Sequence, residues 1–397
     1  MSDQIKHPDT FCAAPFIAAE ITIDGTLQPC CMYKVDEEMR RLPNEFPLHN
    51  FRNFKNWREN VLSPLKNELM GGIKHDRCNV CWERESVSKW HGSLRLEYNR
   101  QYKDYIAKEF DPNKLDDVRY LSVQFGNYCN LKCIQCNSMY SSSHETEEKQ
   151  HKEKFAALEL LTLRNSERKW YQTQEFEQLK PELISNLDRI QLYGGEPLIT
   201  PQAIKFLNSI PDPSRVALNV ITNASVIKDD VFELLSKFKS IQLNVSLDGT
   251  GEHAEYVRYG CSWSDVDLNI KKLKTLKNLE SFSINHVFQC TSYKTFLPVL
   301  DYCIEQNLHL VLIRLTHPTH LTINSLPPKL HQKFLTEVQA YQKIYKNNVT
   351  VREWINYATG ILENYNYNLE EHTKFKNHIN LMDEIRQTSF IDVFGEI

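Results

Sequence analysis

The segment GNYCNLKCIQC, residues 126–136, carries three cysteines with the spacing C-x3-C-x2-C. It directly follows RYLSVQF (residues 119–125), whose β-branched and aromatic residues predict a buried strand. We therefore expect Cys129, Cys133 and Cys136 on a loop at the C-terminal end of that strand. Thiolates bind zinc, copper(I) or iron-sulfur clusters. Zinc would need a fourth protein ligand, whereas a 4Fe-4S cluster on three cysteines leaves one iron free. The spacing alone does not decide between these two sites, and three purely structural thiols are a third alternative.

Five further strand-like runs follow, at residues 188–193, 216–222, 240–246, 282–288 and 308–315. Each of the last four is preceded by a segment that can form a helix. Alternating strands and helices predict a parallel sheet with right-handed crossovers. We therefore expect an α/β fold, a partial (βα)6 TIM-like barrel over residues 115–325, with its chemistry at the C-terminal strand ends.

Unusual residues collect at those strand ends. The second run leads into Tyr193-Gly194-Gly195-Glu196-Pro197, the third into Thr222-Asn223, and the fourth into Ser246-Leu247-Asp248-Gly249. Paired glycines allow a backbone to approach a ligand closely, although Gly-Gly after a strand also occurs in plain turns.

The cysteine motif and the strand-end segments together resemble the radical S-adenosylmethionine (SAM) superfamily. The resemblance implies a 4Fe-4S cluster on the three cysteines, with its free iron chelated by the amino and carboxylate groups of SAM. It implies that Gly194, Gly195 and Glu196 bind the SAM amino group, and that Asn223 and Ser246 reach the ribose or the methionyl group. Arg258 would face the SAM carboxylate, which a guanidinium can bind through two parallel hydrogen bonds, with a surface arginine as the alternative. Gln135 departs from the pattern, because the family usually has a hydrophobic or aromatic residue there, over the adenine.

A second group of cysteines lies in the first hundred residues. Cys12 and Cys30 flank a hairpin signal at Asp24-Gly25, and Cys78 and Cys81 form a later C-x2-C pair. Four thiolates in this arrangement could hold zinc or a 4Fe-4S cluster, and Cys31 could replace Cys30.

The stretch C-x12-G-x4-C from Cys12 to Cys30 resembles the twitch and SPASM extensions of radical SAM enzymes, and residues 82–99 resemble twitch-domain proteins as well. This resemblance, which covers about residues 10–320, implies a small N-terminal α+β iron-sulfur domain over residues 1–100 with an auxiliary 4Fe-4S cluster. A structural zinc site is the alternative.

Composition sets outer limits on partners and location. With 47 basic and 51 acidic residues the net charge is −4, which makes a nucleic-acid partner unlikely. The first ten residues are polar and no run approaches about 18 apolar residues, so we expect neither a signal peptide nor a membrane anchor, and a cytoplasmic location. In that compartment, 11 cysteines indicate metal or redox chemistry more than disulfides.

The remaining segments carry weaker signals. Residues 141–169 are rich in charged residues and predict a solvated helix, with His144 and His151 on its exposed face, or a mobile lid. Residues 326–397 predict a mainly helical extension, with Phe334, Val338, Tyr341 and Tyr345 at helical spacing. Cys261 is a candidate hydrogen-atom donor to a substrate radical, whereas Cys290 and Cys303 are expected to be buried hydrophobes.

The resemblance implies an oxidoreductase-type radical SAM enzyme. It would cleave SAM reductively to a 5'-deoxyadenosyl radical, which abstracts hydrogen from a peptide or protein side chain or a small metabolite. A low-potential donor of the flavodoxin or ferredoxin type would supply the electron. Two alternatives stay open: a zinc-binding structural or interaction protein, and a cluster-containing electron carrier without SAM chemistry.

Overall fold

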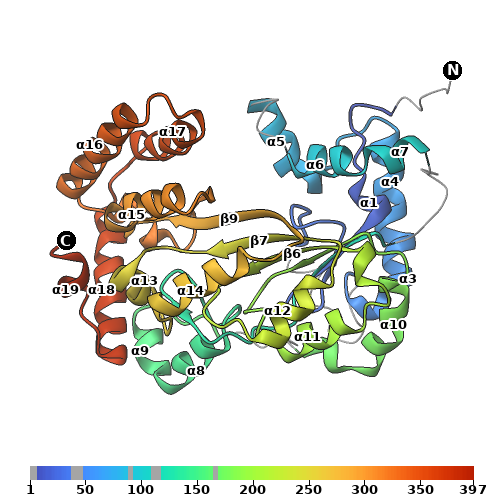
Figure 1. The fold of residues 1–397 in the computed structure, drawn as a ribbon, viewed down its shortest axis with the longest axis horizontal. Helices are drawn as coiled ribbons and strands as arrows, with labels where there is room; N and C mark the ends of the chain where they lie inside the picture. Colours follow the sequence, from blue (N-terminus) through green and yellow to red (C-terminus); the bar gives the residue numbers. More distant parts are fainter. Residues whose placement is uncertain (1–6, 37–47, 88–92, 109–117, 164–168) are drawn as a thin grey trace. The chain divides into compact units, whose positions relative to one another are not determined.

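The computed structural model describes residues 7–36, 48–87, 93–108, 118–163 and 169–397 (Figure 1). Of the twitch-like stretch 82–99, residues 88–92 lie outside the described residues, as do residues 164–168 of the charged segment 141–169. An eight-stranded sheet runs in the order β10-β9-β7-β6-β5-β3-β1-β2. The α/β fold expected from the sequence is therefore confirmed.

All six predicted strands are present in the sheet. They are β3 (Tyr120–Val123), β5 (Arg189–Leu192), β6 (Ala217–Thr222), β7 (Ser240–Ser246), β9 (Leu279–Phe288) and β10 (His309–Arg314). The pairs β3–β5, β7–β9 and β9–β10 are parallel. Burial alternates along β5 and β7, because successive side chains point to opposite faces of the sheet and one face packs against helices.

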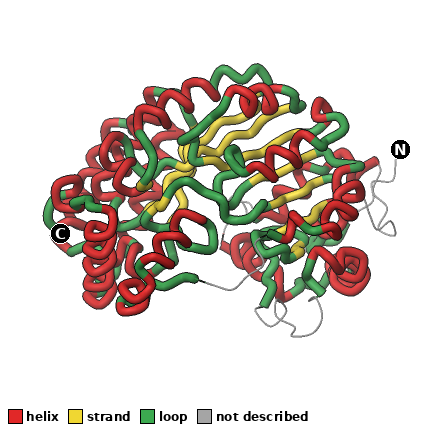
Figure 2. Tube along the Cα trace, turned by 90° about the horizontal axis from the view of Figure 1, so that it is seen from below, coloured by secondary structure: helices red, strands yellow, loops and turns green. Residues whose placement is uncertain are grey.

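Helices connect the parallel strands where the sequence predicts them. These are α11 (Pro201–Asn208), α12 (Asp229–Ser236), α14 (Trp263–Leu273) and α15 (Ser292–Glu305), and α10 (Gln174–Ile184) precedes β5. On α14 the buried residues are Val266, Ile270 and Leu273, the spacing that places apolar side chains on one helix face. Figure 2 shows such helices, in red, running alongside the yellow strands.

The predicted N-terminal hairpin is confirmed. Strands β1 (Ala18–Ile21) and β2 (Leu27–Gln28) pair antiparallel, and Gly25 in the turn has φ +79°. β1 also pairs in parallel with β3, with Ala18 opposite Tyr120, which the sequence did not predict. The hairpin thus extends the main sheet. Short helices follow it: α3 (Phe54–Trp57), α4 (Ser63–Met70), α5 (Asn79–Val87), α6 (Leu94–Gln101) and α7 (Lys103–Lys108).

The chain forms two compact units. The first unit consists of residues 1–126, 166–194 and 205–219, and the second of residues 127–165, 195–204 and 220–397. The division into segments 1–100, 115–325 and 326–397 stays a prediction.

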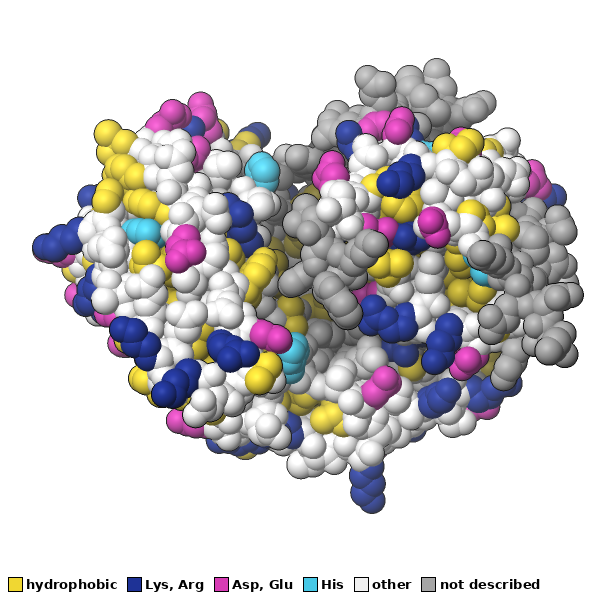
Figure 3. Space-filling view, turned by 90° about the horizontal axis from the view of Figure 1, so that it is seen from above, with side chains coloured by type: hydrophobic (Ala, Val, Ile, Leu, Met, Phe, Trp, Pro, Cys, Tyr) yellow, Lys and Arg dark blue, Asp and Glu magenta, His cyan; other side chains and the backbone are white. Residues whose placement is uncertain are grey.

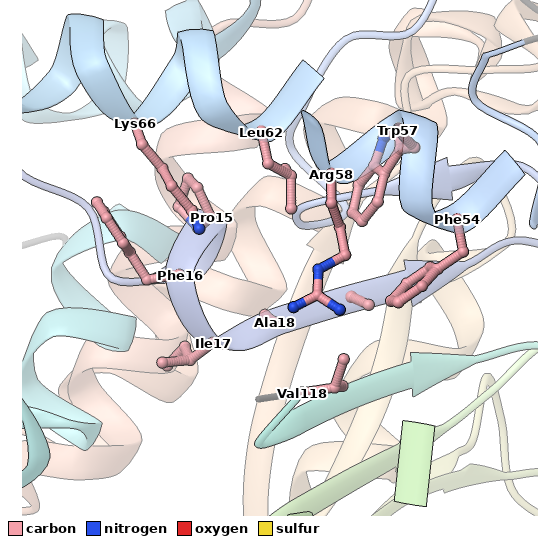
Figure 4. A pocket seen from close by; sticks show the side chains of 11 residues that line it. Pro15, Phe16, Ile17, Ala18, Phe54, Trp57, Arg58, Leu62, Lys66 and Val118 are labelled. Atoms are coloured by element: carbon pink, nitrogen blue, oxygen red, sulfur yellow. The ribbon is translucent and has the colours of Figure 1, made fainter. Parts of the chain in front are cut away.

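Helix α1 (Ala14–Ile17) and helices α3 and α4 line a small pocket in the first unit (Figure 4). Its walls are mainly apolar, with two basic side chains among them. Arg58 pairs with Glu182 at 2.5 Å, and the Lys66 ammonium lies 4.9 Å from the centre of the Phe16 ring. Both cations are therefore engaged by groups of the protein itself.

The C-terminal extension is helical, as predicted. It consists of α16 (Pro328–Ile344), α17 (Val349–Glu363), α18 (Leu369–Arg386) and α19 (Phe390–Phe394), and α16 packs against α17 (Figure 1). Phe334 and Val338 on α16 are fully buried, and the Phe334 ring stacks on Phe288 of β9 at 5.8 Å. This contact joins the extension to the parallel strands of the second unit.

The surface mixes charges of both signs. On the face shown in Figure 3, basic and acidic side chains of the described residues are interspersed. Within those residues, no helix has both the length and the apolar character needed to cross a bilayer.

Candidate active site

The three cysteines of the C-x3-C-x2-C motif lie on one loop of the second unit. Cys133 is buried in the two-residue strand β4 (Lys132–Cys133), Cys129 and Cys136 are half-buried, and all three are free thiols. The Cys136 amide donates to the Cys133 carbonyl at 3.0 Å. Burial and the neighbouring Cys133 raise the pKa of Cys129 to about 12, and burial together with the other two cysteines raises the pKa of Cys136. The three sulfurs are therefore crowded in an environment that disfavours thiolates unless a cation joins them.

Helix α8 (Ser142–Gln150) holds this loop from its N-terminal end. The Ser143 hydroxyl donates to the Cys129 carbonyl at 2.7 Å, and the Ser141 hydroxyl donates to the Leu131 carbonyl at 2.7 Å. His144 Nε2 lies 2.7 Å from the Cys133 carbonyl, and burial, followed by the charge of Arg386, lowers the pKa of His144 to about 4. A neutral imidazole therefore donates to the loop. The placement of His144 on a solvated face was wrong, since the residue is only 4% exposed.

A buried network of charged side chains connects α8 to α18 and to the cysteine loop. Glu147 accepts from Arg386 Nη2 at 2.7 Å and from Arg386 Nε at 3.2 Å, and Lys132 Nζ lies 2.7 Å from the same carboxylate. Burial alone would raise the pKa of Glu147, but hydrogen bonds and charge from Arg386 and Lys132 lower it overall. The last long helix of the chain is thereby tied to the helix that holds the cysteine loop.

A two-stranded ladder brings Arg258 to the cysteine loop. In it β4 pairs antiparallel with β8 (Arg258–Tyr259), and Cys133 lies opposite Arg258. The Arg258 guanidinium lies 3.6 Å from Cys133 Sγ through Nη1 and 2.8 Å from Asp248 through Nη2, and its buried Nε has no hydrogen-bond partner among the described residues. The Nε–H group of Arg258 is thus available to donate a hydrogen bond to a ligand.

Gln135 has a local reason to be polar. Its Nε2 donates to Asp248 at 2.5 Å, beside the bond from Arg258 to the same carboxylate oxygen. The other oxygen of Asp248 accepts from the Val287 amide at 2.7 Å. The position before the last cysteine therefore serves a buried carboxylate network.

The Gly194-Gly195-Glu196 segment is tightly constrained. Gly195 has φ +58°, and a Cβ there would lie 2.6 Å from the Tyr128 carbonyl oxygen. Both oxygens of the buried Glu196 carboxylate accept hydrogen bonds, from the Thr222 hydroxyl at 2.7 Å and from the Asn223 amide at 2.5 Å. Burial raises the pKa of Glu196 to about 6, although these hydrogen bonds act to lower it. The carboxylate therefore fastens this loop to the end of β6.

Asn223, Ser246 and Cys261 lie in the second unit. Asn223 Nδ2 is 3.9 Å from Cys129 Sγ and 3.2 Å from Asn130 Oδ1, which places it directly beside the cysteine loop. Ser246 is half-buried at the end of β7, opposite Asn285 of β9. Cys261 donates to the Ala254 carbonyl at 3.6 Å. Burial raises the pKa of Cys261 to about 12, while nearby Arg258 lowers it.

The N-terminal cysteines gather in the first unit. Burial raises the pKa of Cys12 to about 12, with further contributions from Cys78 and Cys81. Burial also raises the pKa of Cys30, and Cys12 and Cys31 contribute to this shift. Cys12, Cys30 and Cys78 also contact one shared apolar cluster. Cys31 is exposed, but Cys81 is among the groups that raise its pKa. Both Cys30 and Cys31 therefore stay candidate ligands.

The donor chemistry of both cysteine groups fits iron-sulfur ligation. Every cysteine of both groups is a free thiol, and each group brings together sulfur donors of the type that iron-sulfur clusters require. Within the described residues, no three His, Cys, Asp or Glu side chains form a ready site for one metal ion. A cubane cluster spreads its ligands over separate irons, so it requires a wider arrangement than one ion does.

Comparison with known proteins agrees with this site. Residues 123–291 match the family model of the Radical SAM superfamily. This segment contains the cysteine motif, the Gly-Gly-Glu segment and Arg258. This part of the chain is thus similar to radical SAM domains, and the match supports the assignment of the protein as an enzyme. No curated protein shows significant sequence similarity to the chain.

Solved structures that this chain matches in part include native anSMEcpe with bound AdoMet, at 18% identity and a TM-score of 0.40, covering 58% of this chain and 61% of that one. Streptococcus suis SuiB bound to S-adenosylmethionine matches at 16% identity and a TM-score of 0.36, covering 72% and 62%. SuiB bound to its precursor peptide SuiA matches at 16% identity and a TM-score of 0.37, covering 84% of this chain and 70% of that one. The chain spans about three fifths of the length of the anSMEcpe structures.

Proposed function

We propose that this chain is a radical SAM enzyme that abstracts hydrogen from a peptide or protein side chain or from a small metabolite. The observation that carries the proposal is the loop of Cys129, Cys133 and Cys136 beside the guanidinium of Arg258, within the matched segment. A 4Fe-4S cluster on these cysteines, with SAM bound, would supply one-electron cleavage of SAM to methionine and a 5'-deoxyadenosyl radical. A flavodoxin- or ferredoxin-type protein is the proposed electron donor.

The protein side chains have separate tasks in this proposal. Arg258 offers its unpartnered Nε to the SAM carboxylate, while Asp248 fixes the direction of the guanidinium through Nη2. Gly194 and Gly195 give the SAM amino group access to the backbone, and Glu196 keeps that backbone in place through its bonds to the end of β6.

Asn223 and Ser246 are the proposed contacts to the ribose or the methionyl group. Support for Asn223 comes from its position beside Cys129 Sγ. Ser246 lies at the C-terminal end of a parallel strand, where barrel enzymes place their active sites.

A second 4Fe-4S cluster in a twitch-like domain over residues 1–100 is the proposed role of the N-terminal cysteines. Its ligands would be Cys12, Cys78, Cys81 and either Cys30 or Cys31. The packing of Cys12, Cys30 and Cys78 against one apolar cluster supports a shared site. A reducing cytoplasm is the proposed compartment, because it keeps such thiols available for metal.

Cys261 is the proposed hydrogen-atom donor to a substrate radical. Support for this role comes from the backbone, where the Cys261 amide donates to the Arg258 carbonyl at 3.1 Å. Cys261→Ala should then change the product or slow turnover. Unchanged product and unchanged turnover would end this assignment.

Anaerobic reconstitution with iron and sulfide tests the proposal. The wild-type chain should take up about eight irons, as two 4Fe-4S clusters, and form 5'-deoxyadenosine from SAM and a strong reductant. A Cys129→Ala, Cys133→Ala, Cys136→Ala triple variant should lose about four irons and all 5'-deoxyadenosine formation.

The matched control is Cys290→Ala with Cys303→Ala, since both thiols are fully buried and belong to neither group, so iron content should be unchanged. A colourless protein that retains zinc would support the structural alternative. Bound clusters without SAM binding would support an electron carrier.

A further inference from the structure

One face of the sheet in the first unit is lined with polar side chains. Gln28, Glu20, Ser122 and Gln191 lie directly opposite one another on β2, β1, β3 and β5, and we call them the polar row. Glu20, Gln28 and Ser122 are buried. The residues that follow or precede them on the opposite face, such as Ile21, are apolar. Polar groups are buried at a cost unless they find partners, so a row of this kind needs an explanation.

Two more polar residues extend the polar row toward the C-terminal strand ends. The Tyr193 hydroxyl donates to Glu20 Oε1, and Gln124 and Ser122 also form hydrogen bonds with Tyr193. Gly194 leaves room for the Gln124 amide, since a Cβ there would lie 2.7 Å from Gln124 Oε1. Glu20 is thus held from one side by a hydrogen-bonded cluster.

The remaining atoms of this cluster are acceptors without donors. Glu20 Oε2 and Gln124 Oε1 are buried, and neither has a hydrogen-bond partner among the described residues. No Lys or Arg of the described residues forms an ion pair with Glu20, although the carboxyl is only 2% exposed. Without a cation, burial raises the pKa of Glu20 to about 7, so the carboxyl holds a proton over much of the range below neutral pH. A buried carboxylate is ordinarily paired with a cation, so a cation supplied from outside the chain would displace this proton and complete the site.

The two open atoms of this cluster favour a cation. Glu20 Oε2 and Gln124 Oε1 are both hydrogen-bond acceptors, so they would repel an anion and attract N–H groups with positive charge.

Sequence position links this cluster to the radical SAM motifs. Gln124 comes five residues before Cys129, and Tyr193 immediately precedes Gly194-Gly195. Both therefore stand at the C-terminal ends of β3 and β5, the end of a barrel strand at which ligands bind.

We propose that Glu20, together with Gln124, binds a positively charged N–H group of the substrate, an ammonium or a guanidinium group. This assignment rests on the proposed function for its link to catalysis, but the binding site itself is defined by residues of the first unit. The substrate class is then an amine-bearing metabolite or a peptide with a basic side chain.

Calorimetric titration of the reconstituted full chain tests the site with n-butylammonium, ethylguanidinium and the neutral n-butanol. The wild-type chain should bind at least one cation more tightly than n-butanol. Glu20→Gln keeps an acceptor for Tyr193 but removes the charge, and should weaken cation binding by about tenfold or more. Preference between the two cations tells a lysine-like group from an arginine-like one.

Two further variants keep the test decisive. Glu233→Gln, on an exposed face of α12, is the matched control and should bind as the wild type does. Tyr193→Phe removes the phenol and keeps the carboxylate, so it should retain the preference for a cation over n-butanol.

Equal binding of cations and n-butanol by the wild type, or equal cation binding by Glu20→Gln, would overturn the assignment. Measurement of 5'-deoxyadenosine in the same preparations separates the two proposals. Cation binding without SAM cleavage would contradict the proposed function and support the cation site. SAM cleavage without cation binding would support the proposed function and contradict the cation site.

Discussion

Arg386 and Glu147, 239 residues apart in the sequence, form an ion pair with two hydrogen bonds in which both side chains are 2% exposed. Glu147 belongs to α8, which holds the cysteine loop, and Arg386 ends α18, beyond the segment that matches the superfamily. The C-terminal extension is therefore part of the support for the candidate active site.

Replacing Arg386 by Met should destabilise the protein by about 3–5 kcal/mol, because it leaves the Glu147 carboxylate buried with only Lys132 beside it. Denaturant unfolding under anaerobic conditions measures this loss. Lys154→Met is the control, since the Lys154–Glu384 pair is solvent-exposed and its loss should leave stability almost unchanged. Similar losses in the two variants would contradict the special role of the buried pair.

Glu20 should make stability depend on pH. Burial raises its pKa from 4.5 to about 7, so the folded chain holds a proton that the unfolded chain releases at lower pH. The free energy of unfolding should therefore fall as pH rises from about 4.5 to about 7, by on the order of 3 kcal/mol, and change no further above that range. Urea unfolding from pH 5 to 8 should show this slope in the wild type and not in Glu20→Gln. Parallel profiles for the two proteins would show that Glu20 has no such proton.

Gly195→Ala should weaken SAM binding more than its backbone strain alone explains. Gly251 offers a matched comparison, because it has φ +56° and open space around its missing Cβ, whereas Gly195 has φ +58° and a Cβ would meet the Tyr128 carbonyl at 2.6 Å. Gly251→Ala should cost about 1–2 kcal/mol of stability and leave SAM affinity unchanged. Equilibrium dialysis of SAM against both variants checks the difference. Equal SAM affinity in the two would rule out a role for the close approach at Gly195.

Arg258→Lys should raise the Kd for SAM by about tenfold or more, because a lysine keeps the charge but lacks the planar fork and the Nε donor. Arg352→Lys, on an exposed face of α17, should bind SAM normally. Iron content should be measured alongside, so that loss of the cluster is told apart from loss of SAM. Full SAM affinity in the iron-loaded Arg258→Lys variant would remove Arg258 from the SAM site.

The strand pattern of the barrel could be predicted because each strand is a contiguous apolar or alternating run of four to ten residues. The hairpin at Asp24-Gly25 could be predicted because its turn requires a residue that tolerates positive φ, and Gly25 has φ +79°. These signals are local, so a single sequence contains them in full.

Contacts between distant segments could not be predicted in this way. Strands β4 and β8 have two residues each, too few for any periodicity, although they place Cys133 opposite Arg258. The polar residues of α8 resemble a solvated surface in the sequence, because His144 and Glu147 find their partners only in the folded chain. Gln135 departs from the family pattern for the same kind of reason, since its partner Asp248 lies 113 residues away.

The pairing of β1 with β3 sets an order on synthesis. The hairpin leaves the ribosome first, but its sheet partner at Tyr120 follows about a hundred residues later. At ordinary elongation rates this interval lasts roughly 5–20 s. During that time β1 has an open edge, and Cys12, Cys30 and Cys31 are already available to metal or to oxidants before β3 has been synthesised. We therefore expect the N-terminal cysteines to depend on chaperones or on the order of cluster insertion during biogenesis.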